Sequence, residues 1–220
     1  MIWLVGGQGP GSVPLDRVGL RPDGVAAAGW RRENRYLPWR SRGYVAQMQP
    51  SPSASRRWRV TSEEPDPATV ERLLRKLPTW FGIESSVVEY IESARRLPAY
   101  LAWPHGPAPV GLSPDLPAGV LLAVRHFPRS AEIYLMAVDP AVHRQGAGRA
   151  LVTALESDLI ADHVEFLQVK TLGPAHPDPG YARTRQFYAS VGFQPLEEIS
   201  GLWPGNPCLI MIKTMAPPSP

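Results

Sequence analysis

The chain has 220 residues, which is enough for one substantial domain and too few for two ordinary ones. Hydrophobic residues make up 44% and charged residues 20%, and no apolar run approaches the roughly 20 residues that cross a bilayer. The apolar start Met1–Val5 lacks the basic residues of a secretory signal, and Cys208 is the single cysteine. We therefore expect a cytoplasmic protein without a membrane span, a disulfide or a structural zinc site.

The formal net charge of +3 is distributed unevenly along the chain. Residues 1–60 hold ten arginines, no lysine and three acidic residues, so this part carries +7 and the remainder carries −4. Arginine-rich tails can bind nucleic acid through phosphate contacts. These arginines are scattered among Gly, Pro, Ser and aromatic residues without a regular period. We therefore interpret residues 1–57 as a basic, disordered extension and not primarily as a nucleic-acid-binding element.

Regular hydrophobic patterning begins at Trp58 with a predicted strand over 58–61. Asp66 can cap a helix that Pro67 starts, and leucines follow at helical spacing. A second helix is predicted from Glu84 to a point before Pro98. Three further strands, joined by turn-forming residues and arranged as an antiparallel meander, are expected over 100–103, 119–127 and 131–138.

After Asp139-Pro140 the spacing of the hydrophobic residues changes again, from that of a strand to that of a helix. The remaining predicted elements are a helix over 146–161, a strand over 166–171, a helix over 181–191 and strands over 193–199 and 209–213. This order of elements predicts an α/β (α+β) domain over 58–214, with a mixed sheet and helices on both faces. Residues 215–220 are proline-rich and are expected to form a loose tail.

Gly146 and Gly148 lie at the turn where the chain passes from the strand over 131–138 into the next helix, which starts there. Glycines lack Cβ, so their backbone N–H groups can approach a ligand closely at the positive end of the helix dipole. Such a turn can bind a pyrophosphate. A Rossmann site does not fit because the third glycine within a βαβ unit is missing, and a P-loop does not fit because no Gly-Lys-Ser/Thr follows.

Two motifs together resemble the GNAT superfamily, whose pattern is a strand, then Q/R-x-x-G-x-G/A and a helix, and later F-Y-x-x-x-G-F. The first is represented by His143 to Gly148 and the second by Phe187 to Phe193. His143 departs from the family pattern, which has Gln or Arg at this position. The resemblance covers most of residues 58–214 and implies a mostly antiparallel sheet that is splayed at the cofactor site.

The resemblance implies that acetyl-coenzyme A is the acyl donor and that the acetyl group moves directly to a primary amine in a ternary complex. Tyr188 matches the tyrosine that protonates the departing thiolate, and Glu132 is the candidate base for the acceptor ammonium. The main chain of one strand and the glycine-containing turn would contact the cofactor. The implied cofactor-binding residues are Met136, Val138, Arg144, Gln145, Gly146, Ala147, Gly148 and Arg149.

The acceptor is expected to be a small molecule or a peptide that carries the amine. Candidate acceptor-binding residues, from the helical region before 98, the loop before the tyrosine-bearing helix and the final strands, are Trp80, Phe81, Glu89, His176, Asp178, Tyr181 and Trp203. Cys208 lies outside both motifs and is interpreted as a buried structural residue. The five histidines show no metal-ligand spacing, so no metal is predicted.

Two alternatives from other classes stay open from the sequence. One is a catalytically silent GNAT-fold module that binds acyl-coenzyme A and regulates a partner through the arginine-rich segment. The other is a nucleic-acid binder that acts through residues 1–60, whose binding would depend steeply on salt. The presence of both Glu132 and Tyr188 favours the enzyme. A homodimer is an open alternative to a monomer, and the sequence does not identify the acceptor.

Overall fold

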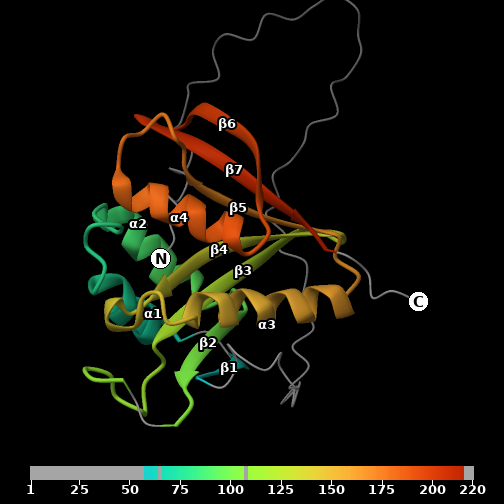
Figure 1. The fold of residues 1–220 in the computed structure, drawn as a ribbon. Coiled ribbons are helices and arrows are strands. Elements are labelled where there is room, and N and C mark those ends of the chain that lie inside the picture. The colour runs from blue at the N-terminus through green and yellow to red at the C-terminus, as the bar shows by residue number, and fades with distance from the viewer. Residues whose placement is uncertain (1–56, 64–65, 107–108, 216–220) are drawn as a thin grey trace, which may run out of the picture.

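The computed structural model describes residues 57–63, 66–106 and 109–215 (Figure 1). The predicted extension, apart from Arg57, and the predicted tail 215–220, apart from Met215, lie outside these residues, and Met215 is buried against the core. The described chain forms a seven-stranded sheet in the order β1-β2-β3-β4-β5-β7-β6. Its strands are β1 Trp58–Glu63, β2 Ala99–Pro104, β3 Gly119–Phe127, β4 Ser130–Val138, β5 Phe166–Leu172, β6 Gln194–Trp203 and β7 Asn206–Thr214.

Two of the helices begin at an aspartate whose side chain caps the helix N-terminus. Asp66 accepts hydrogen bonds from the backbone N–H groups of Ala68 and Thr69, and Asp178 accepts one from Tyr181, each just before a proline at the first helical position. These contacts satisfy N–H groups that have no partner within the helix. The helices are α1 Pro67–Arg75, α2 Glu84–Ser93, α3 Ala147–Ala161 and α4 Pro179–Ser190, with a short 3-10 turn, η1, over Pro140–Val142.

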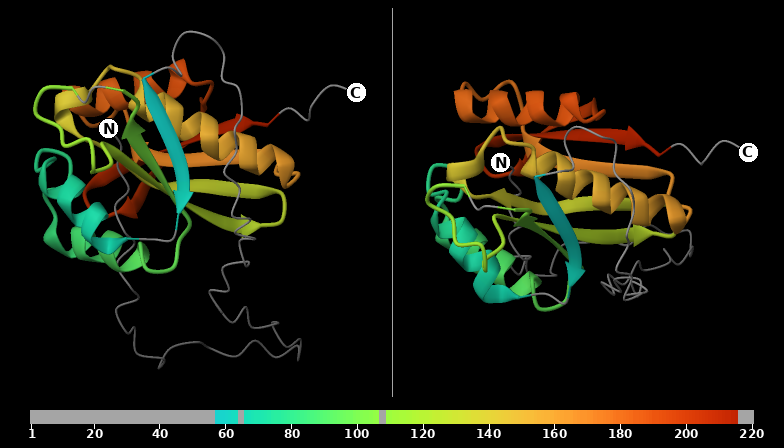
Figure 2. Two further views of the ribbon diagram at one scale, coloured as in Figure 1. Left: turned by 90° about the horizontal axis from the view of Figure 1, so that it is seen from below. Right: turned by 60° about the horizontal axis from the view of Figure 1, so that its bottom comes forward.

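Helices cover both faces of the sheet and enclose two separate cores (Figure 2). One core lies between the sheet and α3 and α4, where Leu151, Leu155 and Tyr188 pack against strand residues. The other core lies between the sheet and α1 and α2, where Leu73 and Tyr90 are fully buried. We call these the α3/α4 face and the α1/α2 face of the sheet.

The sheet is split between β4 and β5, the pair of strands that run parallel. Residues 130–133 of β4 pair with 166–169 of β5, and the pairing ends at Ile133 and Val169 although both strands continue. Beyond that point β4 stays paired with β3, and β5 stays paired with β7. The two halves of the sheet therefore separate, as the GNAT resemblance implied, and backbone groups at this splay are available to a ligand.

A bulge in β4 lies next to the splay. Leu122 of β3 pairs with Leu135 and Ala123 pairs with Ile133, so Tyr134 is an extra residue in β4. The extra residue changes which side chains share a face. Glu132 and Tyr134 lie on the α1/α2 face, whereas Met136 and Val138 belong to the core on the α3/α4 face.

The predicted order of strands and helices and the mixed fold class are confirmed. The main difference is at the end of the domain, where β6 continues to Trp203, beyond the predicted end at 199. This edge strand is mostly exposed, so it lacks the alternation of buried and exposed residues that marks a strand in the sequence. None of the helices in the described part of the chain is long and apolar enough to cross a membrane.

Candidate active site

The loop between β4 and α3 is held in a defined shape. Asp139 accepts a hydrogen bond from the N–H of Ala141, and its Oδ2 lies 2.6 Å from Lys76 Nζ. Arg144 and Gly146 adopt positive φ values of 64° and 91°. Gly146 is the N-cap residue of α3 and provides no side chain to cap the helix. The first-turn N–H groups of α3 are therefore left for an anionic ligand.

The first strand supports this loop from outside. The indole Nε1 of Trp58 donates to the carbonyl of Gln145 at 2.8 Å, and Arg57 contacts the Gln145 side chain at 3.1 Å. Gln145 in turn donates to the carbonyl of Ala141 at 3.1 Å. These contacts hold the loop at the end of β4.

The basic and small residues at the start of α3 have different surroundings. Arg144 and Arg149 are exposed, and Arg149 donates to the carbonyl and hydroxyl of Ser190 at the end of α4. Ala147 is buried. A Cβ at Gly148 would lie 3.3 Å from the Phe187 ring and 3.6 Å from Met136 Cε, so the absence of a side chain lets α3 approach α4 and β4 closely.

His143, which departs from the family pattern, contacts the end of β4. Its Nε2 lies 2.8 Å from the carbonyl oxygen of Val138, and its ring meets the Trp80 ring edge-on at 6.2 Å. Burial lowers the pKa of His143 below its ordinary value of 6.5. The ring is therefore neutral at pH 7 and donates to the Val138 carbonyl, which fixes the last residue of β4.

The main chain of β4 faces the splay at Met136 and Val138. Asp139 N–H donates to the carbonyl of Ala118 on the β3 side. Successive N–H groups of a strand point to opposite sides, so those of Val138 and Met136 point toward β5. No residue of β5 pairs with this part of β4.

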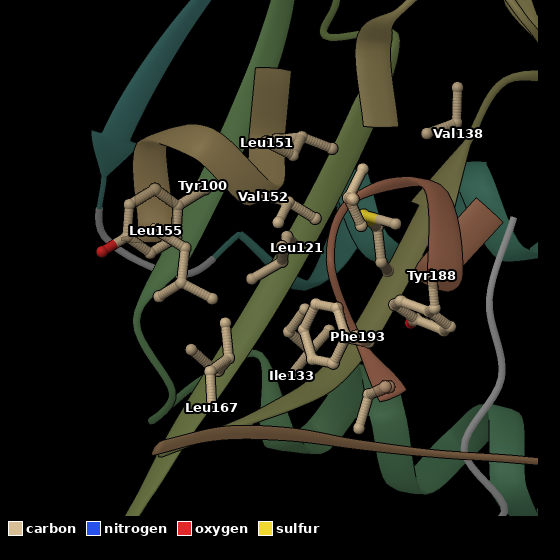
Figure 3. Packing of buried hydrophobic residues seen from close by; sticks show 14 of the residues in the cluster. Tyr100, Leu121, Ile133, Val138, Leu151, Val152, Leu155, Leu167, Tyr188 and Phe193 are labelled. Carbon is tan, nitrogen blue, oxygen red and sulfur yellow. The ribbon is translucent and has the colours of Figure 1, made fainter. Parts of the chain in front are cut away.

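Tyr188 lies on α4 beside the splay, next to Phe193 with ring centroids 5.2 Å apart (Figure 3). The residue is completely buried, and its hydroxyl has no hydrogen-bond partner among the described residues. Burial, and after it the charge of Glu132, raises the pKa of Tyr188 well above its ordinary value. A buried, unpartnered hydroxyl costs about 1–3 kcal/mol. Its position is therefore explained best by a ligand that it contacts.

Two more buried polar atoms near the splay have no partner within the described residues. Thr171 follows Val169, the last β5 residue that pairs with β4, and its hydroxyl is unsatisfied. The indole Nε1 of Trp80 is also unsatisfied, and its ring packs against Leu172 and Tyr181 while meeting His143. Trp80 thus contacts both sides of the splay. Unpartnered donors and acceptors around one opening fit a polar ligand.

Glu132 is 2% exposed and is surrounded by three donors. Its Oε2 lies 2.8 Å from His126 Nε2, 2.7 Å from Gln168 Nε2 and 2.5 Å from Lys170 Nζ. Burial alone raises the pKa of Glu132, but the hydrogen bonds and charges of His126 and Lys170 outweigh it, so the net pKa is lowered. The carboxylate is therefore ionised at neutral pH.

The candidate acceptor-binding residues from the first half of the domain lie on the α1/α2 face. Phe81 is buried and its ring meets that of Tyr90 at 5.9 Å, and Glu89 Oε1 accepts from the Tyr134 hydroxyl at 3.2 Å. Trp80 packs against the same core. These three residues therefore lie on the α1/α2 face of the sheet.

The remaining candidates come from two places. Asp178 caps α4, its backbone N–H donates to His176 Nδ1, and the ring of His176 meets that of Tyr181 at 6.3 Å. Tyr181 is buried and touches Trp80, whereas His176 lies at the outer end of this group. Trp203 is buried in the α1/α2 core at the end of β6. Trp80 links the two groups, because it packs against both Tyr181 and the α1/α2 core.

Within residues 57–63, 66–106 and 109–215, no three His, Cys, Asp or Glu side chains are grouped so that they could hold a metal ion.

Comparisons with known proteins agree with this geometry. Residues 115–195, which include both motifs and β4, match the family model described as the acetyltransferase (GNAT) domain. This part of the chain is therefore similar to a GNAT domain. A search of curated protein sequences found no match.

Solved structures with the same fold include several acetyltransferases. The ribosomal-protein-S18-alanine N-acetyltransferase of Escherichia coli has a TM-score of 0.56 and 18% identity, covering 74% of this chain and 96% of that one. An aminoglycoside 6'-N-acetyltransferase complexed with coenzyme A has a TM-score of 0.55 and 16% identity, covering 74% and 99%. The NatC complex bound to Gag peptide and CoA has a TM-score of 0.54 and 14% identity, covering 73% and 99%. At these identities the similarity establishes the GNAT fold.

Sequence reasoning missed the partners of Glu132 and the unpartnered Thr171. His126, Gln168 and Lys170 are spread over two strands, and they meet Glu132 because Glu132 and Gln168 are directly paired. An alternating polar pattern in β5, at Gln168 and Lys170 between buried neighbours, is the signal that could have drawn attention to them.

Proposed function

We propose that this protein is an acetyl-coenzyme A-dependent N-acetyltransferase that transfers the acetyl group directly to a primary amine of a small molecule or peptide. The observation that carries the proposal is the buried, unpartnered hydroxyl of Tyr188 beside the splay of β4 and β5. Neighbouring proteins of the same fold that are described as bound to coenzyme A support this choice of donor.

The start of α3 is suited to the pyrophosphate of the donor. The free N–H groups from Gly146 to Arg149 and the positive end of the helix dipole would hold the phosphates, with Arg144 and Arg149 adding positive charge. The N–H groups of Met136 and Val138 face the splay, where the pantetheine arm would extend β4 in place of a β5 partner. Acetyl-coenzyme A would supply the thioester that the chain's own groups act on, and coenzyme A would leave as the thiol.

Tyr188 and Val138 would act on the two atoms that gain charge during transfer. The Val138 N–H would stabilise the oxyanion that forms when the amine attacks the thioester carbonyl. The phenol of Tyr188 is neutral at physiological pH because burial raises its pKa, so it can donate a proton to the departing thiolate. His143 supports this arrangement by donating a hydrogen bond to the Val138 carbonyl.

Glu132 would accept the proton that the acceptor ammonium releases. Three donors occupy its Oε2, whereas no described residue donates to its Oε1. A carboxylate with a lowered pKa retains a proton only briefly, so the proton must pass on to solvent. His126 is suited to that transfer because its side chain is 42% exposed and lies 2.8 Å from Glu132.

Cys208 is not suited to form an acyl-enzyme. It is buried on β7, and burial raises the pKa of its thiol to about 11. The thiolate, which is the nucleophilic form, is therefore scarce at neutral pH. This favours direct transfer from the donor to the amine.

A thiol-release assay with acetyl-coenzyme A and a panel of amines tests the proposal. We expect amine-dependent release of coenzyme A together with an acetylated amine in the mass spectrum. Tight binding of acetyl-coenzyme A without release for any amine would contradict the enzyme and support the silent binding module.

Arginine variants test the donor site. We expect the double variant Arg144→Gln/Arg149→Gln to raise the dissociation constant of coenzyme A about tenfold in calorimetry, because it removes two positive charges beside the phosphates. The effect should shrink as salt is added, since both side chains are exposed.

Arg129→Gln is the matched control for the donor site. Arg129 is also exposed, but it precedes β4 at the end opposite to the cofactor loop and pairs with Glu165. Its replacement should leave coenzyme A affinity unchanged. Equal affinities for the wild type and the double variant would contradict the proposed phosphate site.

A further inference from the structure

Glu89, Tyr90 and Tyr134 form a polar cluster on the α1/α2 face of the sheet. The Tyr134 hydroxyl donates to Glu89 Oε1 at 3.2 Å and lies 3.3 Å from Ser93 Oγ. The rings of Tyr90 and Tyr134 meet edge-on with centroids 5.6 Å apart. Tyr134 is the bulged residue of β4, so the bulge turns this side chain toward α2.

The Tyr90 hydroxyl is unsatisfied. Tyr90 is 0% exposed, and no described residue forms a hydrogen bond with its hydroxyl. Burial raises its pKa, and the charges of Glu89 and Glu132 add to this rise together with the neighbouring phenols of Tyr134 and Tyr181. Its ring meets that of Tyr134, whose hydroxyl donates to Glu89, so a donor that carries positive charge would complement this oxygen.

The charge of the cluster is also unbalanced. Glu132 is paired with Lys170 and His126. Glu89, in contrast, forms no salt bridge with a basic side chain of the described residues and accepts a hydrogen bond from a neutral phenol. Glu89 is therefore the carboxylate of this cluster with which a cationic ligand can pair.

The cluster and the proposed reacting centre are distinct positions. Tyr188 belongs to the core on the α3/α4 face, and Tyr90 belongs to the core on the α1/α2 face. Glu132 lies two residues before Tyr134 on β4 and on the same face of the sheet, which connects the cluster to the candidate base. An acceptor whose reacting amine lies beside Glu132 can therefore extend toward Glu89.

We propose that Glu89, Tyr90 and Tyr134 bind a second cationic group of the acceptor, so that the enzyme prefers diamines and polyamines to monoamines. This inference rests on the proposed function, because it assigns the substrate class of the same site. The second ammonium donates hydrogen bonds to the Glu89 carboxylate and to the Tyr90 oxygen.

The test compares putrescine with n-pentylamine, in which a methyl group replaces the second amine. We expect kcat/KM of the wild type to favour putrescine by about ten- to a hundredfold, since hydrogen bonds to a charged group are lost with the monoamine. Tyr90→Phe and Glu89→Gln should each lower kcat/KM for putrescine by about tenfold and leave n-pentylamine unchanged.

Two controls separate binding from folding. Tyr90→Phe removes an unpartnered hydroxyl, so its melting temperature should not fall. Glu92→Gln makes the same change on the same helix at an exposed residue that pairs with Arg95, and it should behave like the wild type.

Equal kcat/KM for the two amines, or variants that lower both equally, would overturn the inference. Absence of transfer to every amine would instead contradict the proposed function. In that case calorimetry still tests whether the cluster binds a cation, by measuring how putrescine associates with the coenzyme A complex of the wild type and of Glu89→Gln. Weaker association with the variant supports the inference. Equal association, or none with either protein, overturns it.

Discussion

Replacing Tyr188 by phenylalanine is expected to lower kcat by about a hundred- to ten-thousandfold without weakening the fold. The variant lacks only the hydroxyl group, which makes no hydrogen bond to the described residues. Its loss therefore removes the proton donor for the thiolate while relieving an unsatisfied buried group. The free energy of unfolding, measured with urea, should stay the same or rise by about 1 kcal/mol.

The combination of effects distinguishes a catalytic phenol from a structural one. If Tyr188 only filled the core, the Tyr188→Phe protein would be less stable than the wild type or would keep its full activity. Phe187→Leu is a useful control, because Phe187 is the neighbouring aromatic residue with its ring 5.5 Å from Tyr188 and lacks a hydroxyl. This control should reduce stability more than Tyr188→Phe does. An active Tyr188→Phe variant would contradict the proposed mechanism.

Replacing Glu132 by glutamine is expected to lower the free energy of unfolding at pH 7 by about 2–3 kcal/mol. The variant leaves Lys170 beside a neutral amide in a mostly buried position, with the lysine side chain 22% exposed. This exposure places the cost below that of a fully buried pair. The double variant Glu132→Gln/Lys170→Met should regain much of the loss, because it removes both charges together.

The contribution of Glu132 should also depend on pH. Its pKa in the folded protein is lowered from the ordinary value of 4.5, so its stabilising effect is complete above that value and is lost as pH falls through the lower, folded pKa. Urea unfolding across this acidic range should show the wild type losing stability faster than Glu132→Gln on acidification. Parallel pH profiles, or a loss well under 1 kcal/mol at pH 7, would contradict the ionised, charge-paired state of this residue.

Local chemistry explains why so much of the fold could be predicted from the sequence. Asp66 and Asp178 are N-cap residues followed by a proline, and this pair of residues identifies the start of a helix directly from the sequence. The glycines at the start of α3 and the aromatic motif at the end of α4 are likewise recognised from residues that are adjacent in the sequence. Each of these features depends on neighbours a few positions away.

The site was less predictable because it depends on one extra residue. With regular alternation, Glu132, Tyr134, Met136 and Val138 would share one face of β4. The bulge at Tyr134 instead places the first two on the α1/α2 face and the last two on the α3/α4 face. The partners of Glu132 depend in the same way on the register between β4 and β5, which are separated by the whole of α3.

The contact between the first strand and Gln145 determines how far the protein can be shortened. Trp58 and Arg57 are the first described residues, and both hold the loop that precedes α3. A shortened protein whose first residue is Arg57 keeps these two contacts. One whose first residue is Arg59 lacks them and leaves the Gln145 carbonyl without the Trp58 hydrogen bond. The arginine-rich segment thus joins the domain within hydrogen-bonding reach of the donor loop.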